Sequence, residues 1–245
     1  MIFPAMRVLI TSVLTFISLF GYTQTIIKPG DNIIRYDLIK PSHDFYKGVF
    51  IDSAGNIKQE FINEEMVAID TANQHLIFTR SRQIPIGNFS TDSSTTDLSF
   101  RPIRLYEIYP QRNVSFDMSL GDTMVSIKTL RKGILSVRNY SMKRGYFDDN
   151  MMEDIFGYLD LKKGATYVLD NFKPDNTEMA SHPYEIEYAF DDVSDLAGHK
   201  LNCRVLHFVL QGVSSGYIWT DKDSRQLVKE VAVFKNGGTF VATKL

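Results

Sequence analysis

The feature that most constrains the fold of this chain is a repeated alternation of apolar and polar residues with a period of two. The alternation runs through residues 114–119, 124–129 and 184–188. Successive side chains of a β-strand point to opposite faces of a sheet, so the pattern is typical of strands with one buried face. Gly121-Asp122 separates the first two segments at the spacing of a hairpin. Short consecutive strands joined in this way predict an antiparallel meander rather than alternating strands and helices.

Further turn sequences separate other apolar segments. Residues 52–56 (DSAGN) lie between 49–51 and 57–61, and residues 235–238 (KNGG) lie between 228–234 and 239–242. The Asn236-Gly237 pair favours positive φ at both central positions of a tight turn, which predicts a hairpin. By contrast, the polar stretch 88–99 (NFSTDSSTTDLS) is predicted to be an exposed loop.

One short helix is predicted at residues 151–159, where apolar residues recur at helical spacing. They are Met151, Met152, Ile155, Phe156 and Leu159. Asp148 or Asp149 can cap the start of this helix, and Lys162-Lys163-Gly164 is expected to close its end. We expect the helix to lie across one face of the sheet.

The segment 203–210 (CRVLHFVL) is apolar on both alternating faces, apart from Arg204 and His207. A strand that is buried on both sides needs a cover on each face. These patterns together predict a mainly β fold, with a large curved antiparallel sheet, a half-barrel or open barrel, and one short helix packed on it. The lone Cys203 has no partner for an internal disulfide, so we expect a buried and inert thiol.

The N-terminus has the three parts of a secretory signal peptide. Arg7 supplies positive charge, residues 8–20 (VLITSVLTFISLF) form an uncharged apolar run, and small or polar residues follow at 21–24. A membrane span needs roughly 20 apolar residues, so an uncleaved anchor is the less favoured alternative. We predict that residues 1–23 are a signal peptide and that no transmembrane span remains after its removal. Residues 24–245 are then expected to form a single β-rich domain, although their length also suits two smaller ones.

The one motif that suggests catalysis is Gly212-Val213-Ser214-Ser215-Gly216, which matches the G-x-S-x-G pattern of α/β-hydrolases. That motif requires a strand-to-helix turn, whereas the residues that follow it here are typical of a strand. No histidine comes after Ser214 in the sequence. A hydrolase would therefore need a base such as His182 or His207 beside Ser214, and the sequence favours no enzymatic activity.

Metal and nucleic-acid binding are not indicated either. The five histidines show no metal-ligand spacing, and the acidic groups at 191–195 and 221–223 lack the glycine and closing glutamate of a calcium loop. We interpret these aspartates as solvated turn residues, and we predict no metal and no cofactor. A formal net charge of −2 is too balanced for a protein that neutralises phosphates, which excludes nucleic acid as a partner.

The C-terminal hundred residues, 146–245, resemble a known family. An acidic-led helix ends in Tyr158-Leu159-Asp160-Leu161, and Lys163-Gly164-Ala165 and a strand come next. The segments 184–190 and 203–210 and a tryptophan strand within 216–228 complete the order. This order resembles a family of exported bacterial proteins defined only as a domain of unknown function, itself similar to half-barrel lipoprotein-localisation (LolA/LolB-like) envelope proteins. The resemblance implies a periplasmic or outer-membrane-associated protein of a Gram-negative bacterium with a concave apolar sheet, and it transfers no functional residues.

The favoured functional hypothesis is a non-enzymatic envelope protein whose curved sheet shelters a hydrophobic or lipid-like ligand. The candidate lining residues are large apolar side chains on C-terminal strands: Tyr188, Phe208, Trp219 and Phe240. The alternative is an interaction or scaffold protein with a filled core and an envelope protein as its partner. A hydrolase that uses Ser214 is the outsider among these hypotheses.

Overall fold

The computed structural model describes residues 24–83, 89–121, 123–141, 145–174, 179–180 and 183–245. Within them, a 15-stranded sheet has the order β1-β11-β14-β15-β16-β17-β18-β2-β3-β4-β5-β6-β7-β8-β9. Its strands are β1 (Thr25–Ile27), β2 (Ser42–Ile51), β3 (Ile57–Asp70), β4 (His75–Gln83), β5 (Phe89–Asp97), β6 (Pro102–Tyr109), β7 (Val114–Leu120), β8 (Met124–Arg131), β9 (Ile134–Ser141), β11 (Thr166–Leu169), β14 (Tyr184–Leu196), β15 (His199–Leu210), β16 (Ser214–Asp221), β17 (Leu227–Phe234) and β18 (Thr239–Lys244). A second, three-stranded sheet contains β10 (Phe147–Asp148), β12 (Asn171–Pro174) and β13 (Met179–Ala180).

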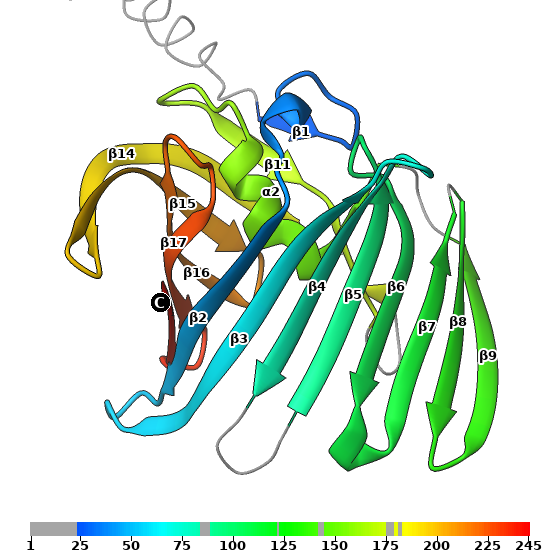
Figure 1. The fold of residues 1–245 in the computed structure, drawn as a ribbon. Helices are drawn as coiled ribbons and strands as arrows, with labels where there is room; N and C mark the ends of the chain where they lie inside the picture. The colour runs from blue at the N-terminus through cyan, green and yellow to red at the C-terminus, as the bar shows by residue number, and fades with distance from the viewer. Residues whose placement is uncertain (1–23, 84–88, 122, 142–144, 175–178, 181–182) are drawn as a thin grey trace, which may run out of the picture.

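The large sheet is strongly curved and stays open (Figure 1). Its neighbouring strands are antiparallel except for β1 and β11, and β18 pairs with β2, which joins the C-terminal strands to the N-terminal ones. The end strands β1 and β9 do not pair with each other, so the sheet is not closed into a barrel. The prediction of a mainly β protein with a large, open, curved antiparallel sheet is therefore confirmed.

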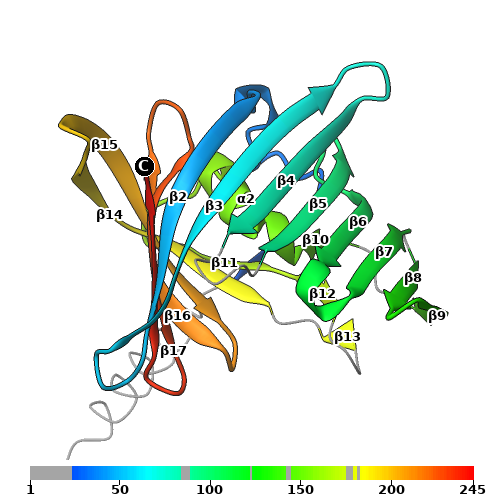
Figure 2. The ribbon, with the colours of Figure 1, turned by 60° about the horizontal axis from the view of Figure 1, so that its bottom comes forward.

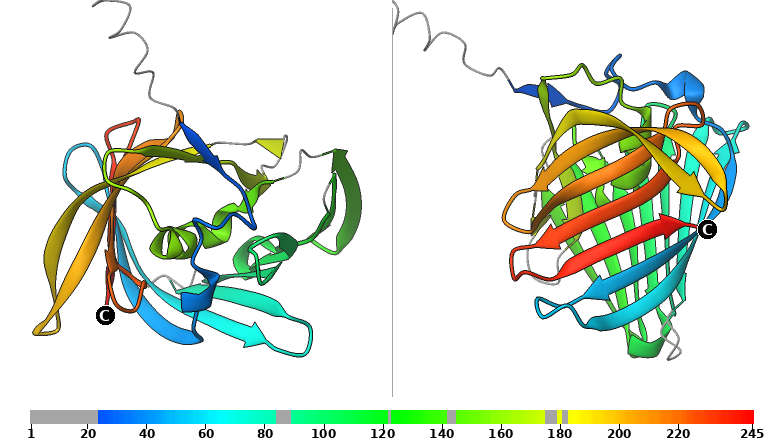
Figure 3. Two further views of the ribbon diagram at one scale, coloured as in Figure 1. Left: turned by 90° about the horizontal axis from the view of Figure 1, so that it is seen from above. Right: turned by 90° about the vertical axis from the view of Figure 1, so that its left-hand side faces the viewer.

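The helix α2 (Met152–Tyr158) lies on the concave side of this sheet, as Figures 2 and 3 show. Met152, Ile155 and Phe156 are each at most 1% exposed, and they belong to one core cluster with Leu206 and Phe208 of β15. Three single-turn 3-10 helices, η1 (Tyr36–Leu38), η2 (Pro110–Arg112) and η3 (Asp149–Met151), complete the elements. The apolar stripe of the helix thus fills the upper part of the concavity.

The two ends of the helical segment differ in how far the sequence predicts them. At the start, Asp148 caps η3 as expected, because its Oδ1 accepts a hydrogen bond from the Asn150 backbone N–H at 3.0 Å. At the end, the expectation for Lys162-Lys163-Gly164 is wrong, because α2 stops at Tyr158 and Leu159 is already extended. The positive charge comes instead from Arg204 of β15, whose guanidinium donates to the carbonyl oxygens of Phe156, Gly157 and Leu159.

The hairpins predicted from turn sequences are all present. They are β2–β3, β7–β8 and β17–β18. Cys203 is 0% exposed in β15, as expected. In β14, the predicted alternation holds through Tyr188, but a β-bulge before Phe190 then reverses the faces, so Phe190 lies across from Val205 and is 44% exposed.

Two sequence interpretations of polar segments are wrong. Residues 89–97 of the expected loop form β5, in which Ser94 and Thr96 are at most 1% exposed, because the strand pairs on both sides and adds polar groups to a polar part of the sheet. Asp191 and Asp192 are strand residues of β14 rather than turn residues. The predicted signal peptide, 1–23, lies outside the described residues. In the part of the chain that the structure describes, no helix is long and apolar enough to cross a membrane.

Candidate functional site

Below α2, the concave face of the sheet changes from apolar to charged. The strand register aligns Glu65 of β3 with Arg80 of β4, and Arg80 with Asp92 of β5. The helix adds two carboxylates from above. We call this set the inner charge cluster; its members are Asp44, Glu65, Arg80, Asp92, Glu153, Asp154, Glu230 and Lys244. The carboxyl groups outnumber the cations in it, which is unusual for groups that are largely removed from water.

Arg80 is the central cation of the inner charge cluster. Its Nε donates to Glu65 Oε1 at 2.8 Å, and its Nη2 pairs with Glu153. The side chains of Arg80 and Glu65 are only 11% and 13% exposed. A buried ion pair of this kind recovers the desolvation of its charges only while both partners are present, so the cluster depends on Arg80.

Burial raises the pKa values of several carboxyl groups in the cluster. For Glu65, Arg80 acts against this effect without cancelling it. The pKa values of Asp154 and Glu230 are well above the ordinary range, because burial is reinforced there by neighbouring carboxylates. Burial also raises the pKa of Asp92 to about 6. These groups therefore keep their protons to higher pH than free carboxyls do, and a protonated carboxyl donates a hydrogen bond.

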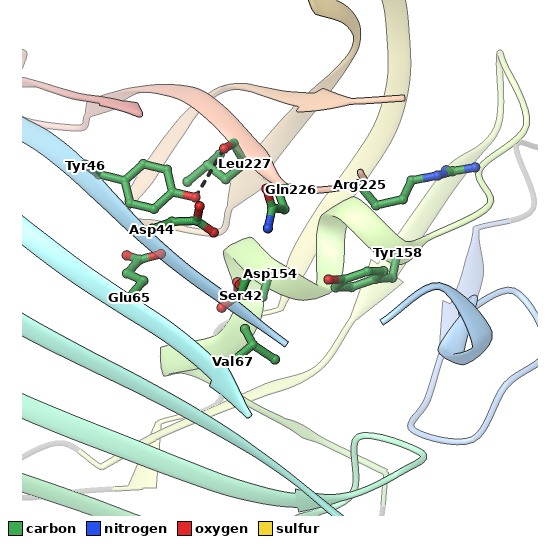
Figure 4. A pocket seen from close by; sticks show the side chains of 10 residues that line it. All are labelled: Ser42, Asp44, Tyr46, Glu65, Val67, Asp154, Tyr158, Arg225, Gln226 and Leu227. Carbon is green, nitrogen blue, oxygen red and sulfur yellow. Dashed lines mark hydrogen bonds between the residues drawn. The ribbon is translucent and has the colours of Figure 1, made fainter. Parts of the chain in front are cut away.

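A small polar pocket opens on one side of the cluster (Figure 4). It has a volume of about 10 Å³, which is room for a single water molecule. Its lining comes from β2, β3, α2, the turn before β17 and the first residue of β17: Ser42, Asp44, Tyr46, Glu65, Val67, Asp154, Tyr158, Arg225, Gln226 and Leu227. Nearby, Lys244 Nζ lies 2.7 Å from both Asp44 Oδ1 and Gln226 Oε1. A second pocket, also of about 10 Å³, lies beside Arg80 and Asp92. Both pockets suit water or a small polar group rather than an acyl chain.

An aromatic cluster occupies the concave face beyond the charges. Its members are Phe50 of β2, Phe61 of β3, Phe234 of β17 and Phe240 of β18. The rings of Phe50 and Phe240 are 4.9 Å apart, and those of Phe61 and Phe240 stack at 6.0 Å. Phe61 is buried, whereas Phe50, Phe234 and Phe240 are half-buried and leave apolar surface open. We call these four residues the aromatic cluster.

Gly48 makes room for the Phe61 ring. The two residues are register partners in β2 and β3, and a Cβ added to Gly48 would lie 2.3 Å from ring atoms of Phe61. Any larger residue at position 48 would therefore push the ring away. A glycine in the interior of a strand weakens it and often marks such a close approach.

Arg82 of β4 connects the aromatic cluster with the polar part of the face. Its guanidinium carbon lies 4.7 Å from the centroid of the Phe61 ring, and its Nε donates to Asn63 Oδ1 at 3.1 Å. Burial lowers the pKa of Arg82, and the nearby Arg80 adds to the effect. Among the residues that the structure describes, no carboxylate forms an ion pair with Arg82. It is a half-buried cation that presents N–H donors beside open apolar surface.

The four residues predicted to line a ligand cavity are distributed over three places. Phe208 belongs to the core under α2, where its ring lies 6.1 Å from that of Tyr184. Tyr188 packs at the edge of the same core, with its hydroxyl on Asp191. Trp219 pairs with Val205, and this pair lies three positions along the strands from the Phe208–Gly216 pair. An odd number of positions reverses the face, so the Trp219 side chain lies on the opposite side of the sheet from Phe208, where its indole N–H donates to Asp192. Only Phe240 lies in the aromatic cluster.

Among the described residues, His207 is not placed to act as a base for Ser214. The segment forms the β15–β16 hairpin, in which Ser214 lies across from Leu210 and His207 lies across from Tyr217. These two pairs are out of phase, so Ser214 and His207 face opposite sides of the sheet. His207 pairs instead with Glu187 at 3.2 Å. His182 lies outside the described residues, within which no group of three His, Cys, Asp or Glu is placed to hold a metal ion.

Comparisons with known proteins identify a family and a fold. The model of a family described as "Protein of unknown function (DUF3108)" matches residues 54–243. No curated protein matches the chain. A solved β-barrel-like protein of domain of unknown function DUF1849 from Brucella abortus is similar, with 10% identity, a TM-score of 0.53 and coverage of 86% of this chain and 97% of that one. The hypothetical lipoprotein YmcC from Escherichia coli matches with 11% identity, a TM-score of 0.38 and coverage of 88% and 90%. At such identities, the Brucella protein shows the fold alone.

Proposed function

The chain belongs to the DUF3108 family of proteins of unknown function, and we propose that it binds an amphipathic lipid-like molecule with an anionic head on the concave face of its sheet. In this proposal it is a non-enzymatic protein, exported by means of residues 1–23 to the periplasm or the outer membrane. The aromatic cluster contacts the apolar chain of the ligand, and Arg82 binds its carboxylate or phosphate. The observation that carries the proposal is the position of Arg82, which forms no ion pair among the described residues and lies beside the open aromatic surface.

The apolar part of the ligand is argued from the exposure of the aromatic cluster. Phe50, Phe234 and Phe240 are half-buried, and the strand register puts them on the same inner face as the core under α2, where a ligand would be partly surrounded. Covering apolar surface contributes roughly 25 cal/mol per Å², so an acyl chain laid along these rings gains free energy with each methylene. The favoured site therefore lies at residues 50, 61, 234 and 240, and Phe240 is the residue that it shares with the sequence prediction.

The charge of the head group is argued from Arg82. The two cations of the inner charge cluster already have carboxylate partners, since Arg80 pairs with Glu65 and Glu153, and Lys244 pairs with Asp44. Arg82 holds only the neutral Asn63 among the described residues. A guanidinium in partly dehydrated surroundings binds a carboxylate or phosphate through paired, charge-assisted hydrogen bonds.

The inner charge cluster sets the inner limit of this site. Along β3, Glu65 of this cluster lies between Phe61 and Val67 of the apolar core under α2, whereas on β18 Phe240 packs against that core directly. Phe208 and Phe156 of the core are each at most 2% exposed. An acyl chain that passed through the cluster would remove charged groups from water without replacing their hydrogen bonds, at a cost of several kcal/mol per ion. The chain is therefore expected to lie along the rings and toward the open side rather than to enter the core.

Binding of a fluorescent polyene fatty acid and of its methyl ester tests the proposal. The protein should bind the acid at least tenfold more tightly than the ester, and Arg82→Gln should remove this difference while circular dichroism stays unchanged. Phe240→Ala should weaken both probes. The matched control is Phe190→Ala, which removes an exposed ring from the other face and should alter neither affinity. Failure of both probes to bind, together with an absence of lipid in an extract of the natively purified protein, would refute the proposal.

A further inference from the structure

The β8–β9 hairpin is the free end of the large sheet and carries only positive charge. No acidic residue occurs between Asp122 and Asp148 in the sequence. Lys128, Arg131, Lys132 and Arg138 are all exposed on the hairpin. The whole chain has a formal net charge of −2. The basic residues at this edge therefore give the molecule an uneven charge distribution, with a positive end at the β8–β9 hairpin.

The same hairpin exposes large apolar side chains on both of its faces. Ile134 is 74% exposed, Leu135 64% and Val137 54%. Alternation along β9 puts Ile134 on the concave face, the side on which Tyr140 packs against the second core cluster, and puts Leu135 and Val137 on the convex face. Leu130, register partner of Leu135 in β8, is 44% exposed and extends the convex patch.

No strand covers the outer edge of β9 among the described residues. Residues 134–139 of β9 are exposed, and only Tyr140 near the end of the strand packs against the second core cluster. Beside the tip, an open hollow is lined by the apolar residues Ile108, Pro110, Val114 and Leu130 together with Asn113, Ser115, Lys132 and Gly133. Isolated exposed apolar residues are ordinary, but a continuous basic and apolar edge of this kind indicates an interaction surface.

We infer that the β8–β9 hairpin docks the protein on an anionic lipid surface. Its basic side chains meet the lipid head groups, and Ile134, Leu135 and Val137 enter the boundary with the acyl chains. The exposure on both faces favours lipid over a protein partner, because a protein surface laid on one face of the hairpin would leave the apolar residues of the other face in water. A bilayer interface surrounds an inserted hairpin tip and covers both faces together. This docking is independent of the ligand proposed for Arg82.

Co-sedimentation with vesicles tests the inference. The N-terminal residue of the protein used is first determined from its intact mass by mass spectrometry. The protein should bind vesicles of phosphatidylcholine containing 30% phosphatidylglycerol and should show little binding to phosphatidylcholine alone. Each basic residue near an anionic surface changes partitioning by roughly fivefold, so the triple variant Lys128→Gln, Arg131→Gln, Lys132→Gln should lose binding on the order of a hundredfold. Raising the salt concentration should weaken binding of the parent protein in the same direction.

Two further variants separate lipid insertion from charge and from folding. The double variant Ile134→Ser, Leu135→Ser should lose binding although it keeps every charge. The matched control is Val193→Ser, Lys200→Gln on the β14–β15 hairpin, where Val193 is 56% exposed, and it should bind like the parent. Equal binding to neutral and anionic vesicles, or equal loss in the control, would overturn the inference. The inference would also be overturned if the parent protein does not bind vesicles but forms a dimer in sedimentation equilibrium, and if Ile134→Ser, Leu135→Ser abolishes that dimer.

Discussion

Arg204 Nη2 donates a hydrogen bond to the carbonyl oxygen of Gly157 at 2.7 Å, which ties the end of α2 to the centre of β15 across 47 residues of sequence. The same guanidinium reaches the carbonyl oxygens of Phe156 and Leu159. A helix leaves its last carbonyl groups without partners within the helix, and a cation near them is favourable both as a donor and against the helix dipole. A buried arginine is thus the group that fixes the helix inside the curved sheet.

Removal of this guanidinium should destabilise the whole fold. Arg204→Met keeps much of the apolar stem but leaves buried carbonyl oxygens of α2 without donors. We expect a loss of about 2–4 kcal/mol in the free energy of unfolding, since an unsatisfied buried group costs roughly 1–3 kcal/mol. Urea unfolding followed by tryptophan fluorescence measures it. Lys235→Met, on an exposed lysine of the turn after β17, is the control and should change stability by less than about 0.5 kcal/mol.

The close contact of α2 with the turn before β17 should make stability sensitive to any increase in side-chain volume at Gly157. A Cβ added to Gly157 would lie 1.9 Å from the carbonyl oxygen of Arg225, which is backbone and has little freedom to move. Gly157→Ala should therefore cost more than 2 kcal/mol, near the large end for single substitutions. Gly55→Ala is the comparison, because its added Cβ meets open space and only the positive φ of 86° opposes it, at roughly 1 kcal/mol. Equal losses in the two variants would contradict the assigned contact.

Stability should fall as pH rises from about 4 to about 7 because of Asp148. Burial raises the pKa of this carboxyl to about 7, while in the unfolded chain it keeps its ordinary value near 3.8. Between these values the folded state holds a proton that the unfolded state has released, so each rise in pH favours unfolding. At pH 8 both states are ionised, and the full cost of burying the charge is present.

Asp148→Asn should remove the part of this dependence that comes from Asp148, while the part from Asp92, whose pKa burial raises to about 6, remains in both proteins. The asparagine oxygen can still accept the bond from the Asn150 N–H, and no charge is buried. Urea unfolding at pH 5 and pH 8 should show that the parent protein loses about 2–4 kcal/mol more than the variant over this interval, at about 1.4 kcal/mol per pKa unit. Parallel pH profiles of the two proteins would exclude Asp148 as the source.

Local patterns in the sequence suffice for the hairpins but not for the site. Alternation and turn residues act over a few positions, which is why β7–β8 and β17–β18 are predicted correctly. The inner charge cluster requires that β18 pair with β2 and that α2 lie above β3 and β4, relations between distant segments. The face of Trp219 depends on the exact pairing of β15 with β16, which no single segment contains.

The strand β5 also could not be predicted from its own sequence. Its polar composition is typical of a loop, but Asp92 belongs to the inner charge cluster, and on the other face the hydroxyl groups of Ser93 and Thr79 lie 3.4 Å apart. A polar strand is stable where the neighbouring strands present polar groups to it. The sequence of β5 alone does not say which strands those are. A signal for Arg82 does exist in the sequence, because Arg80 and Arg82 alternate with polar residues in β4 and so share one face.

A substitution at Gly48 connects this packing to the proposed ligand. Gly48→Ala places a methyl group where the ring of Phe61 now lies, so the ring must tilt away from the Arg82 guanidinium stacked on it. We expect a loss of about 1–3 kcal/mol in stability from the crowding, and a five- to tenfold weaker affinity for the fluorescent fatty acid, as the ring and the cation no longer form one surface. Titration with the fatty acid at 15 °C, where circular dichroism shows the variant to be fully folded, separates the effect on affinity from the effect on stability. If the folded variant binds as tightly as the parent, Phe61 and Arg82 lie outside the ligand site. The Gly198→Ala variant, with similar backbone strain in the turn between β14 and β15, should bind normally.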